Sequence, residues 1–384
     1  MSGQSKERAH DRLRRLAQEG LDVARFLDEA SAALAPAVPN GTDSMEQPYW
    51  YTLDPESHLI TSDYGGSGCS LDTAAVMRWE YLDDDVNKYT EVLRHPRGVQ
   101  TLHEVTEGQP ERSRIYREYM AEVGLAQEML VSLRAHTGEV WGTLRLNRGP
   151  GQPEFDAADL EFMTTVAPHL AEGLRRGLLV GEATDPDLPD APGIVVLDRR
   201  GELESLSPTA EQWIAALPGP QFGRGLPASV ASVACAAFDR VSGERPDDES
   251  TALVRTIDGQ WLSLHGTVIS VEGNPKTAVI IEPARRHRVA LLLMAIYGLT
   301  SREREVTLLV LRGCSTAELA ISLGISPHTV QQHLKGIFDK TGVRSRRELM
   351  GRVFFDSFDP RVADNGHRVQ IKKPIRGGPL RDVP

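Results

Sequence analysis

Apolar and polar positions in the first half of the chain switch between the spacing of helices and the spacing of strands. The clearest strand pattern is a β-hairpin whose two arms meet at Thr137-Gly138. Asp156 is a good N-cap for the long helix that follows it. We expect helices over residues 6–34 (broken near Gly20), 71–94, 112–122 and 157–179, and strands over 50–53, 59–64, 127–134 and 140–146. This order predicts an α+β fold with an antiparallel sheet over residues 1–183.

A linker rich in proline and aspartate, residues 184–192, precedes a second and smaller pattern of strands and helices. Turns are expected at Arg200-Gly201 and Asp258-Gly259. The pattern predicts strands over residues 194–197, 203–206, 252–257, 261–268 and 277–281, and helices over residues 208–217 and 228–241. A small α+β domain is therefore expected over residues 190–285.

Four short helices are predicted between residues 299 and 355, because each has its own start signal. Three of them begin with the spacing of a capping box: Thr300 with Glu303, Ser315 with Glu318, and Ser345 with Glu348. Ser326 caps the third helix, whose first residue is Pro327, where the missing N–H costs nothing. Gly313 and Gly324 are expected to close the first and second helices. Two helices joined by a three-residue turn around Gly324 form a helix-turn-helix motif.

The third of these helices carries the functional signal. At helical spacing, an apolar side collects Val330, Leu334, Ile337 and Thr341. A polar stripe on the opposite side collects His328, Gln331, Gln332, Lys335 and Asp339. Glutamine amides bond N6 and N7 of adenine, and lysine donates to O6 and N7 of guanine. Since a helix in the major groove meets these base edges, the stripe predicts sequence-specific binding of double-stranded DNA.

Charge is distributed unevenly along the chain. The formal net charge is −11, yet residues 299–357 carry nine basic against six acidic residues. Residues 358–384 carry six against three, and they are poor in apolar positions. We therefore predict a linker helix over residues 286–298, an all-α DNA-binding domain over 299–357 and a disordered basic tail over 358–384. An acidic front would confine DNA binding to one surface.

Several classes of protein are disfavoured by the sequence. No stretch reaches the roughly 20 apolar residues of a membrane span, and the N-terminus is polar, so we expect a cytoplasmic protein without membrane contact. Three cysteines, Cys69, Cys235 and Cys314, lack metal-ligand spacing and do not suggest a disulfide framework. We expect no metal and no cofactor. Without a nucleophile elbow or a metal motif, we also expect no catalytic residues and no enzyme.

The residues between 299 and 346 resemble the LuxR-type DNA-binding domain. The resemblance rests on runs at nearly every expected position: 299–306, Gly313, 315–320, 323–330, His333-Leu334, Ile337, Lys340, Gly342-Val343 and 344–346. It implies that Gln331, Gln332 and Lys335 read bases. It also implies that the phosphate backbone is contacted by Thr316, Ser326, His328, Thr329, Lys340, Arg344 and Arg346.

Some positions depart from this family or have a plainer explanation. His328 and Gln331 stand where the family usually has lysine, which implies a weaker grip on phosphate. His333 lies toward the apolar side, where a packed histidine is expected. Lys340 and Arg346 have the alternative of being solvated surface charges. Asp339 would repel a phosphate, so we expect it beyond the groove.

The fourth helix exposes more apolar surface than one small domain can easily bury. Family resemblance implies a homodimer contact through Leu349, Met350 and Val353, and the alternative is packing on the other three helices. A two-fold dimer would bind half-sites about one helical turn apart.

Residues 1–180 resemble a GAF-type sensor domain. The resemblance rests on the element order, on Val140-Trp141-Gly142-Thr143-Leu144 and on Phe155-Asp156. Residues 190–285 look PAS-like from element order alone. The whole arrangement is similar to actinobacterial-type regulators that join a sensor to a LuxR-type end.

Sheets of this kind often hold a small ligand against one face. Candidate pocket residues for a small-molecule effector are Trp50, Tyr64, Trp79, Tyr81 and Tyr89, each of which has the alternative of an ordinary core aromatic. The sequence thus predicts a transcriptional regulator controlled by a ligand or partner. Two alternatives remain: a front domain that is an enzyme acting on a small molecule, and a helical end that binds protein instead of DNA.

Overall fold

The computed structural model describes residues 2–42, 48–65, 73–180, 189, 191–218, 225–242, 250–271 and 274–355. They form two compact units. The first contains the chain up to residue 180 together with 192–257 and 262–282, and the second contains 258–261 and 283–355. Cys69, most of the expected linker and the expected basic tail lie outside the described residues. Among the described residues, no helix combines the length and apolarity needed to cross a bilayer.

The first sheet of the first unit has five strands in the order β2-β1-β5-β4-β3, and neighbouring strands are antiparallel. Its strands are β1 (Tyr49–Leu53), β2 (Ile60–Gly65), β3 (Val99–Thr101), β4 (Gln127–Arg134) and β5 (Val140–Arg148). Its α-helices are α1 (Ser2–Leu16), α2 (Val23–Leu34), α3 (Thr73–Tyr81), α4 (Tyr89–Val92), α5 (Leu102–Val105) and α6 (Ala157–Gly177). Two other helical turns are η1 (Pro110–Arg112) and η2 (Tyr116–Met120). The predicted hairpin and long helix are confirmed.

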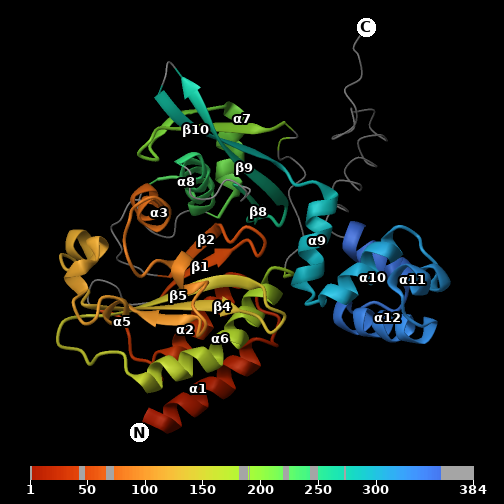
Figure 1. Cartoon of the computed structure of the whole chain (residues 1–384), viewed down its shortest axis with the longest axis horizontal. Helices are drawn as coiled ribbons and strands as arrows, with labels where there is room; N and C mark the ends of the chain where they lie inside the picture. Colours follow the sequence, from red (N-terminus) through yellow and green to blue (C-terminus); the bar gives the residue numbers. More distant parts are fainter. Residues whose placement is uncertain are drawn as a thin grey trace. The chain divides into compact units, whose positions relative to one another are not determined.

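One face of this sheet packs against α2 and α6, which lie beneath it in Figure 1. Leu144 and Leu146 are fully buried on that face. Gly142 lets α6 approach, because a Cβ there would come within 2.5 Å of the Tyr51 carbonyl oxygen and 2.9 Å of Leu174. We call this the helix-covered face, and the other, which carries Tyr51 and Arg145, the opposite face.

The second sheet has the same strand arrangement, β7-β6-β10-β9-β8. Its strands are β6 (Gly193–Leu197), β7 (Leu203–Leu206), β8 (Thr251–Arg255), β9 (Trp261–Val271) and β10 (Asn274–Pro283), and its helices are α7 (Pro208–Ala216) and α8 (Ala228–Ser242). Two antiparallel sheets with helices confirm the predicted α+β fold.

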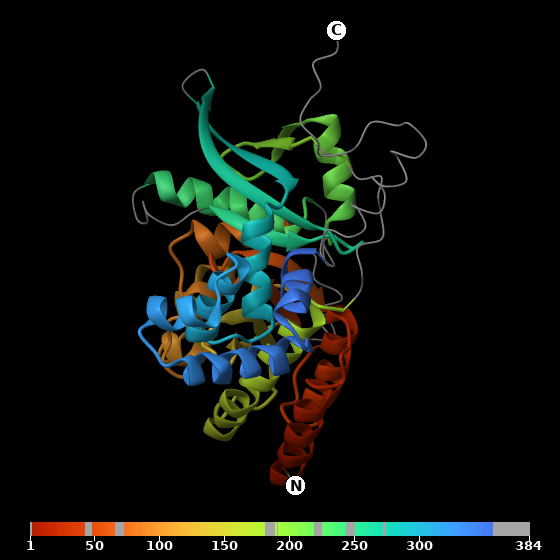
Figure 2. The same cartoon turned by 90° about the vertical axis from the view of Figure 1, so that its right-hand side faces the viewer.

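Helix α8 lies between the two sheets (Figures 1 and 2). On one side, Gly266 of β9 allows close contact, since a Cβ there would come within 2.6 Å of the Val233 carbonyl oxygen. On the other side, Cys235 shares a buried cluster with β1, β2 and α3. The Ser232 hydroxyl also donates to the Ile60 carbonyl oxygen at 2.8 Å. The two sheets therefore pack through one shared helix.

The second unit contains α9 (Arg286–Ile296), α10 (Ser301–Leu311), α11 (Thr316–Leu323), α12 (Pro327–Thr341), α13 (Arg346–Met350) and η3 (Gly351–Phe355). Its core joins Ala290 and Met294 of α9 to Leu334 and Ile337 of α12. The expected linker helix thus contributes to this core, and the all-helical C-terminal region is confirmed.

Two helices expected in the front are shorter than the sequence suggested. The region 71–94 is broken between α3 and α4, where Asn87 has a φ of +60° and turns its amide toward Glu128. Within the expected helix 112–122, residues 114–120 are helical, and the last five of them form a π-helix. The short strand β3 was not predicted, because three residues show too little alternation.

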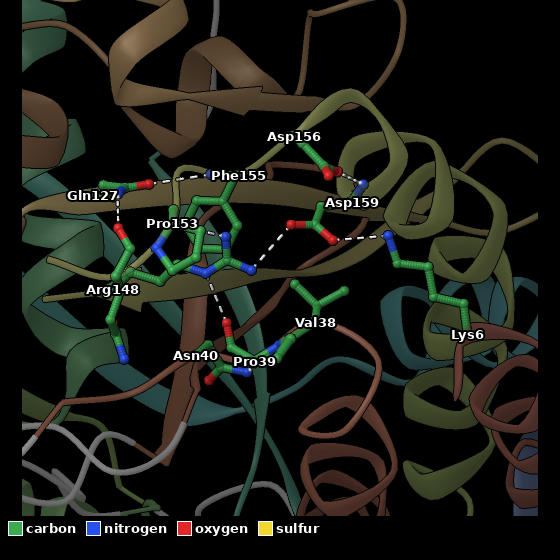
Figure 3. A network of polar contacts seen from close by, with 11 residues as sticks. Lys6, Val38, Pro39, Asn40, Gln127, Arg148, Pro153, Phe155, Asp156 and Asp159 are labelled. Atoms are coloured by element: carbon green, nitrogen blue, oxygen red, sulfur yellow. Dashed lines mark hydrogen bonds and ion pairs between the residues drawn. The ribbon is translucent and has the colours of Figure 1, made fainter. Parts of the chain in front are cut away.

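A buried arginine ties together three segments of the first sheet's region (Figure 3). The Arg148 guanidinium donates to the Pro39 and Pro153 carbonyl oxygens at 2.8 and 3.0 Å and to Asp159 at 3.0 Å. Its Cζ also lies 4.0 Å from the centre of the Phe155 ring. The other Asp159 oxygen accepts from Lys6 at 2.8 Å, which fastens α1 to α6.

Replacing Arg148 should destabilise the first unit. In Arg148→Met, Asp159 keeps Lys6 but loses its guanidinium partner, and two backbone carbonyl oxygens lose their donor. We expect a loss of about 3 kcal/mol in the free energy of unfolding, because a buried carboxylate is left without its main partner. Urea titration followed by circular dichroism measures it. The control is Arg112→Met, whose pair with Glu107 is exposed and should contribute less than about 1 kcal/mol. Equal losses in both variants would contradict this role.

Candidate nucleic-acid interface

The helix-turn-helix forms as the capping signals predict. Gly324 ends α11 in the left-handed region, with φ 64° and ψ 34°. Ser326 then caps α12, and its hydroxyl accepts from the Thr329 N–H at 3.1 Å. Pro327 occupies the first helical position. The chain therefore turns sharply between α11 and α12.

The two sides of α12 differ as expected. Val330, Leu334, Ile337 and Thr341 are buried. His328, Gln331, Gln332, Lys335 and Asp339 are exposed, and they define the polar stripe. His333 is half-buried between these sides. One exposed row of amide, imidazole and ammonium groups thus runs along α12.

Neighbouring groups orient the amides of the polar stripe. The Gln332 Nε2 lies 3.2 Å from the His328 Nε2, one helical turn earlier. The Gln331 Nε2 donates to the Thr316 hydroxyl of α11 at 3.4 Å. These contacts are long and exposed, so the amides can exchange them for base edges at small cost.

The predicted phosphate-contacting residues fall into two groups. Ser326, Thr329 and Arg344 lie at the surface or partly exposed, and the Ser326 and Thr329 hydroxyls are 2.9 Å apart at the start of α12. Arg346 is partly buried and donates to the Cys314 carbonyl oxygen at 2.8 Å and to the Thr316 hydroxyl at 2.9 Å. Its guanidinium thereby stabilises the start of α11. A phosphate bound by Arg346 would have to share the guanidinium N–H groups with these two acceptors.

Lys340 lies at the surface of the helical unit, where its ammonium is paired. Its ammonium lies 2.6 Å from a Glu303 oxygen and donates to the Gly298 carbonyl oxygen at 3.1 Å. Glu303 also accepts from the backbone N–H of Thr300 at 2.7 Å in the first capping box. Burial raises the pKa of Glu303, but the bonds from Lys340 and Thr300 outweigh it, and the net pKa is lowered.

The fourth capping signal needs a correction. The Ser345 hydroxyl accepts from the Glu348 N–H at 3.1 Å, as expected. The Glu348 carboxylate accepts from the N–H of Arg344, at 2.8 Å, rather than from that of Ser345. Ser345 caps α13, and the reciprocal half of a capping box is displaced by one residue.

The three predicted dimer residues are placed differently. Leu349 and Val353 belong to the core of the helical unit, at 0% and 1% exposure. Met350 is 37% exposed. Of the three, Met350 is the side chain available for contact with a second copy, and the dimer itself stays a prediction.

The five predicted pocket residues lie in several places. Trp50 is buried on the helix-covered face, where its Nε1 donates to Ser31 of α2 at 3.0 Å, and Tyr64 pairs with it across the strands. Tyr81 and Tyr89 join hydroxyls beside α8. Trp79 packs on Tyr119.

None of these five is among the residues that line a pocket on the opposite face of the first sheet. That pocket is lined by Tyr49, Tyr51, Val76, Ile115, Tyr119, Met120, Leu125, Glu128, Arg145 and Asn147. The sequence does contain a signal for part of this set, because Tyr49 and Tyr51 alternate with Trp50 and must point away from it.

Two family models match the chain. Residues 298–353 match "Bacterial regulatory proteins, luxR family", and residues 13–174 match "GAF domain". Both matches coincide with the structure, since the first spans α10 to α13 and the second spans the first sheet with its helices.

Curated relatives resemble the C-terminal part. The "Monoamine regulon transcriptional regulator" of Klebsiella aerogenes is 45% identical over 56 residues, which are 15% of this chain and 25% of the relative. "Transcriptional regulatory protein UhpA" of Escherichia coli (strain K12) is 41% identical over 56 residues, 15% of this chain and 29% of the relative. The chain thus spans about a quarter of the length of the curated relatives it matches. A solved Vibrio cholera VqmA-ligand-DNA complex is 19% identical, covering 45% of this chain and 85% of that one, with a TM-score of 0.22.

Replacing Lys340 should lower the stability of the protein, whereas replacing Lys335 of the polar stripe should not. The two variants are Lys340→Met and Lys335→Met. Lys340→Met leaves the buried Glu303 without its ammonium partner, so we expect a loss of the order of 1 kcal/mol at neutral pH. Lys335 is exposed, and its replacement should leave stability unchanged. Thermal unfolding of the full chain measures both.

The pH dependence gives this prediction a second readout. The lowered pKa of Glu303 contributes stability that is present above its ordinary pKa of 4.5 and is lost as the pH falls through the lowered value. The difference between the wild type and Lys340→Met should therefore shrink on acidification below 4.5. An effect of Lys340→Met no larger than that of Lys335→Met would show that the internal pair contributes nothing.

Proposed function

Because the chain carries a GAF domain in residues 13–174 and a LuxR-family helix-turn-helix domain in residues 298–353, we propose that it is a sequence-specific DNA-binding transcriptional regulator. The observation that carries the proposal is the exposed polar stripe of α12, which follows a sharp turn and stands on a buried apolar side. No catalytic group is needed for this role, and its place is the cytoplasm, where bacterial DNA is found.

The stripe supplies the base contacts in this proposal. Gln331 and Gln332 each offer a donor and an acceptor to an adenine edge, and Lys335 offers donors to a guanine edge. Ser326 and Thr329 lie at the start of α12, where free backbone N–H groups attract a phosphate. His328 carries no fixed positive charge where the LuxR type usually has lysine, so base contacts carry a larger share of affinity here.

Charge supports binding through this surface. Residues 299–357 carry three more basic than acidic residues, whereas residues 1–298 carry seventeen more acidic than basic ones. An acidic front repels phosphates and limits non-specific binding. DNA is therefore expected to meet the helical unit alone.

Two further parts of the proposal concern assembly and control. A two-fold homodimer, with Met350 at its contact, would place two copies of α12 about one helical turn apart. A small-molecule effector in the first unit would bias that arrangement. The packing of α8 against both sheets supports this, because a shift of the first sheet would displace α8 and, through it, the second sheet.

Removing the amides or the ammonium of the stripe should weaken specific binding. We expect Gln331→Ala, Gln332→Ala and Lys335→Ala each to cost about 1–3 kcal/mol on the best-bound duplex and to relax base preference at one position. Affinities of the full-length variants for that duplex, and for duplexes with single base changes, measure this by fluorescence anisotropy at fixed salt.

The control for these variants is Gln18→Ala, an exposed amide of the first unit that should leave DNA affinity unchanged. A glutamine variant of α12 that weakened every duplex alike would not be a base reader. Affinities equal to that of Gln18→Ala would rule the stripe out as the reading surface.

A further inference from the structure

The pocket of the first unit opens on the opposite face of the first sheet. Its floor comes from Tyr49 and Tyr51 of β1, Glu128 of β4 and Arg145 of β5. Its other wall comes from α3 and from the segment 115–125. The pocket holds about 400 Å³ of empty space, part of which opens to solvent. It suits one small molecule that extends into the mouth.

A buried charge cluster underlies this pocket. One guanidinium, that of Arg145, lies between two carboxylates, 2.5 Å from a Glu80 oxygen and 3.2 Å from a Glu128 oxygen. The two carboxylates are only 4% and 3% exposed. The second Glu128 oxygen accepts from the Asn87 amide at 2.6 Å, and a Glu80 oxygen accepts from the N–H of Tyr89 at 3.0 Å.

The cluster therefore has one negative charge more than it has positive charge. A buried charge without a counterion is costly, and it is relieved by a proton or by a cation. Burial raises the pKa of Glu128, and Glu80 raises it further, even though Arg145 acts in the opposite direction. Arg145 also lies farther from Glu128 than from Glu80, so the carboxylate that lines the pocket is the less closely paired of the two.

A buried hydroxyl also belongs to the lining of this pocket. Tyr51 is 2% exposed, and its Oη makes no well-formed hydrogen bond among the described residues, although the neighbouring Tyr49 hydroxyl acts on it. Buried polar atoms are normally satisfied, so one left open at a pocket marks a place for a donor from a ligand. Burial also keeps the pKa of Tyr51 well above its ordinary value, so the hydroxyl is neutral.

We propose that this pocket binds a small organic cation, with its ammonium near Glu128 and the Tyr51 hydroxyl. Its apolar part would lie against the rings of Tyr49, Tyr51 and Tyr119. Tyrosine rings attract cations through their faces, and the Tyr49 and Tyr51 rings stand edge to face with centres 4.8 Å apart. The ammonium supplies the missing positive charge, and an N–H donates to Tyr51.

The other ligand charges fit less well. An anion would need Arg145, whose guanidinium already forms ion pairs with Glu80 and Glu128, and it would be repelled by both carboxylates. A neutral molecule would leave the excess charge to be relieved by a proton on Glu128 instead. Asp85 adds to the negative potential at Glu128, which favours a cation further.

The role of this pocket as an effector site rests on the proposed function. Its ligand class does not, so it can be tested without DNA. Three probes of similar size and different charge are benzylammonium, benzyl alcohol and benzoate. Calorimetric titration of the full-length protein at neutral pH should show benzylammonium binding most tightly and benzoate not at all. We expect a preference over benzyl alcohol of about tenfold or more, the usual worth of a hydrogen bond to a charged group.

Two variants and a control locate the binding. Glu128→Gln keeps a side-chain oxygen for Asn87 but removes the charge, and it should abolish the preference of benzylammonium over benzyl alcohol. Tyr119→Leu removes one ring from the outer wall and should weaken benzylammonium while leaving the charge preference. Glu118→Gln, an exposed carboxylate on the same segment, should bind as the wild type does.

The outcomes are distinct from those of the DNA experiments. Equal affinity for the three probes, tighter binding of benzoate, or no binding of benzylammonium overturns the inference, even if the protein binds its DNA site. Unchanged charge preference in Glu128→Gln overturns it as well. If the protein binds benzylammonium selectively but binds no DNA, the result supports the cation site and contradicts only the proposed function.

Discussion

The one-sided burial of α12 is the constraint on which the rest of the helical unit depends. Val330, Leu334 and Ile337 are almost fully excluded from water in a core shared with α9, α10, α11 and α13. Because that side is fixed, the residues on the opposite side of α12 must face outward. The turn at Gly324 and the cap at Ser326 then set where this outward row begins.

Two of the basic side chains that a family resemblance assigns to phosphate are already engaged within the unit. Lys340 neutralises the capping carboxylate Glu303, and Arg346 holds the start of α11 through Cys314 and Thr316. These residues link neighbouring helices, so they support the polar stripe even without touching DNA. Lysine and arginine can either link helices or contact DNA, and the contacts that they make in the structure distinguish the two roles.

Local signals in the sequence predicted most of the helical unit, because caps and apolar spacing act over a few residues. The β4–β5 hairpin and α6 were predictable for the same reason. The break at Asn87 and the cluster of Glu80, Arg145 and Glu128 were not, since they depend on partners far apart in the chain. Trp50 was predicted to line a pocket, but it lies on the helix-covered face. Its neighbours Tyr49 and Tyr51 point to the opposite face and line the pocket there.

If the exposed row of α12 reads base sequence, the protein should select particular sequences from random duplex DNA. The direct test is selection of bound fragments from a random pool, with the full-length protein at modest ionic strength. We expect an enriched motif whose two halves are related by two-fold symmetry and spaced by about one helical turn. A bound pool with the same sequence composition as the starting pool would contradict it.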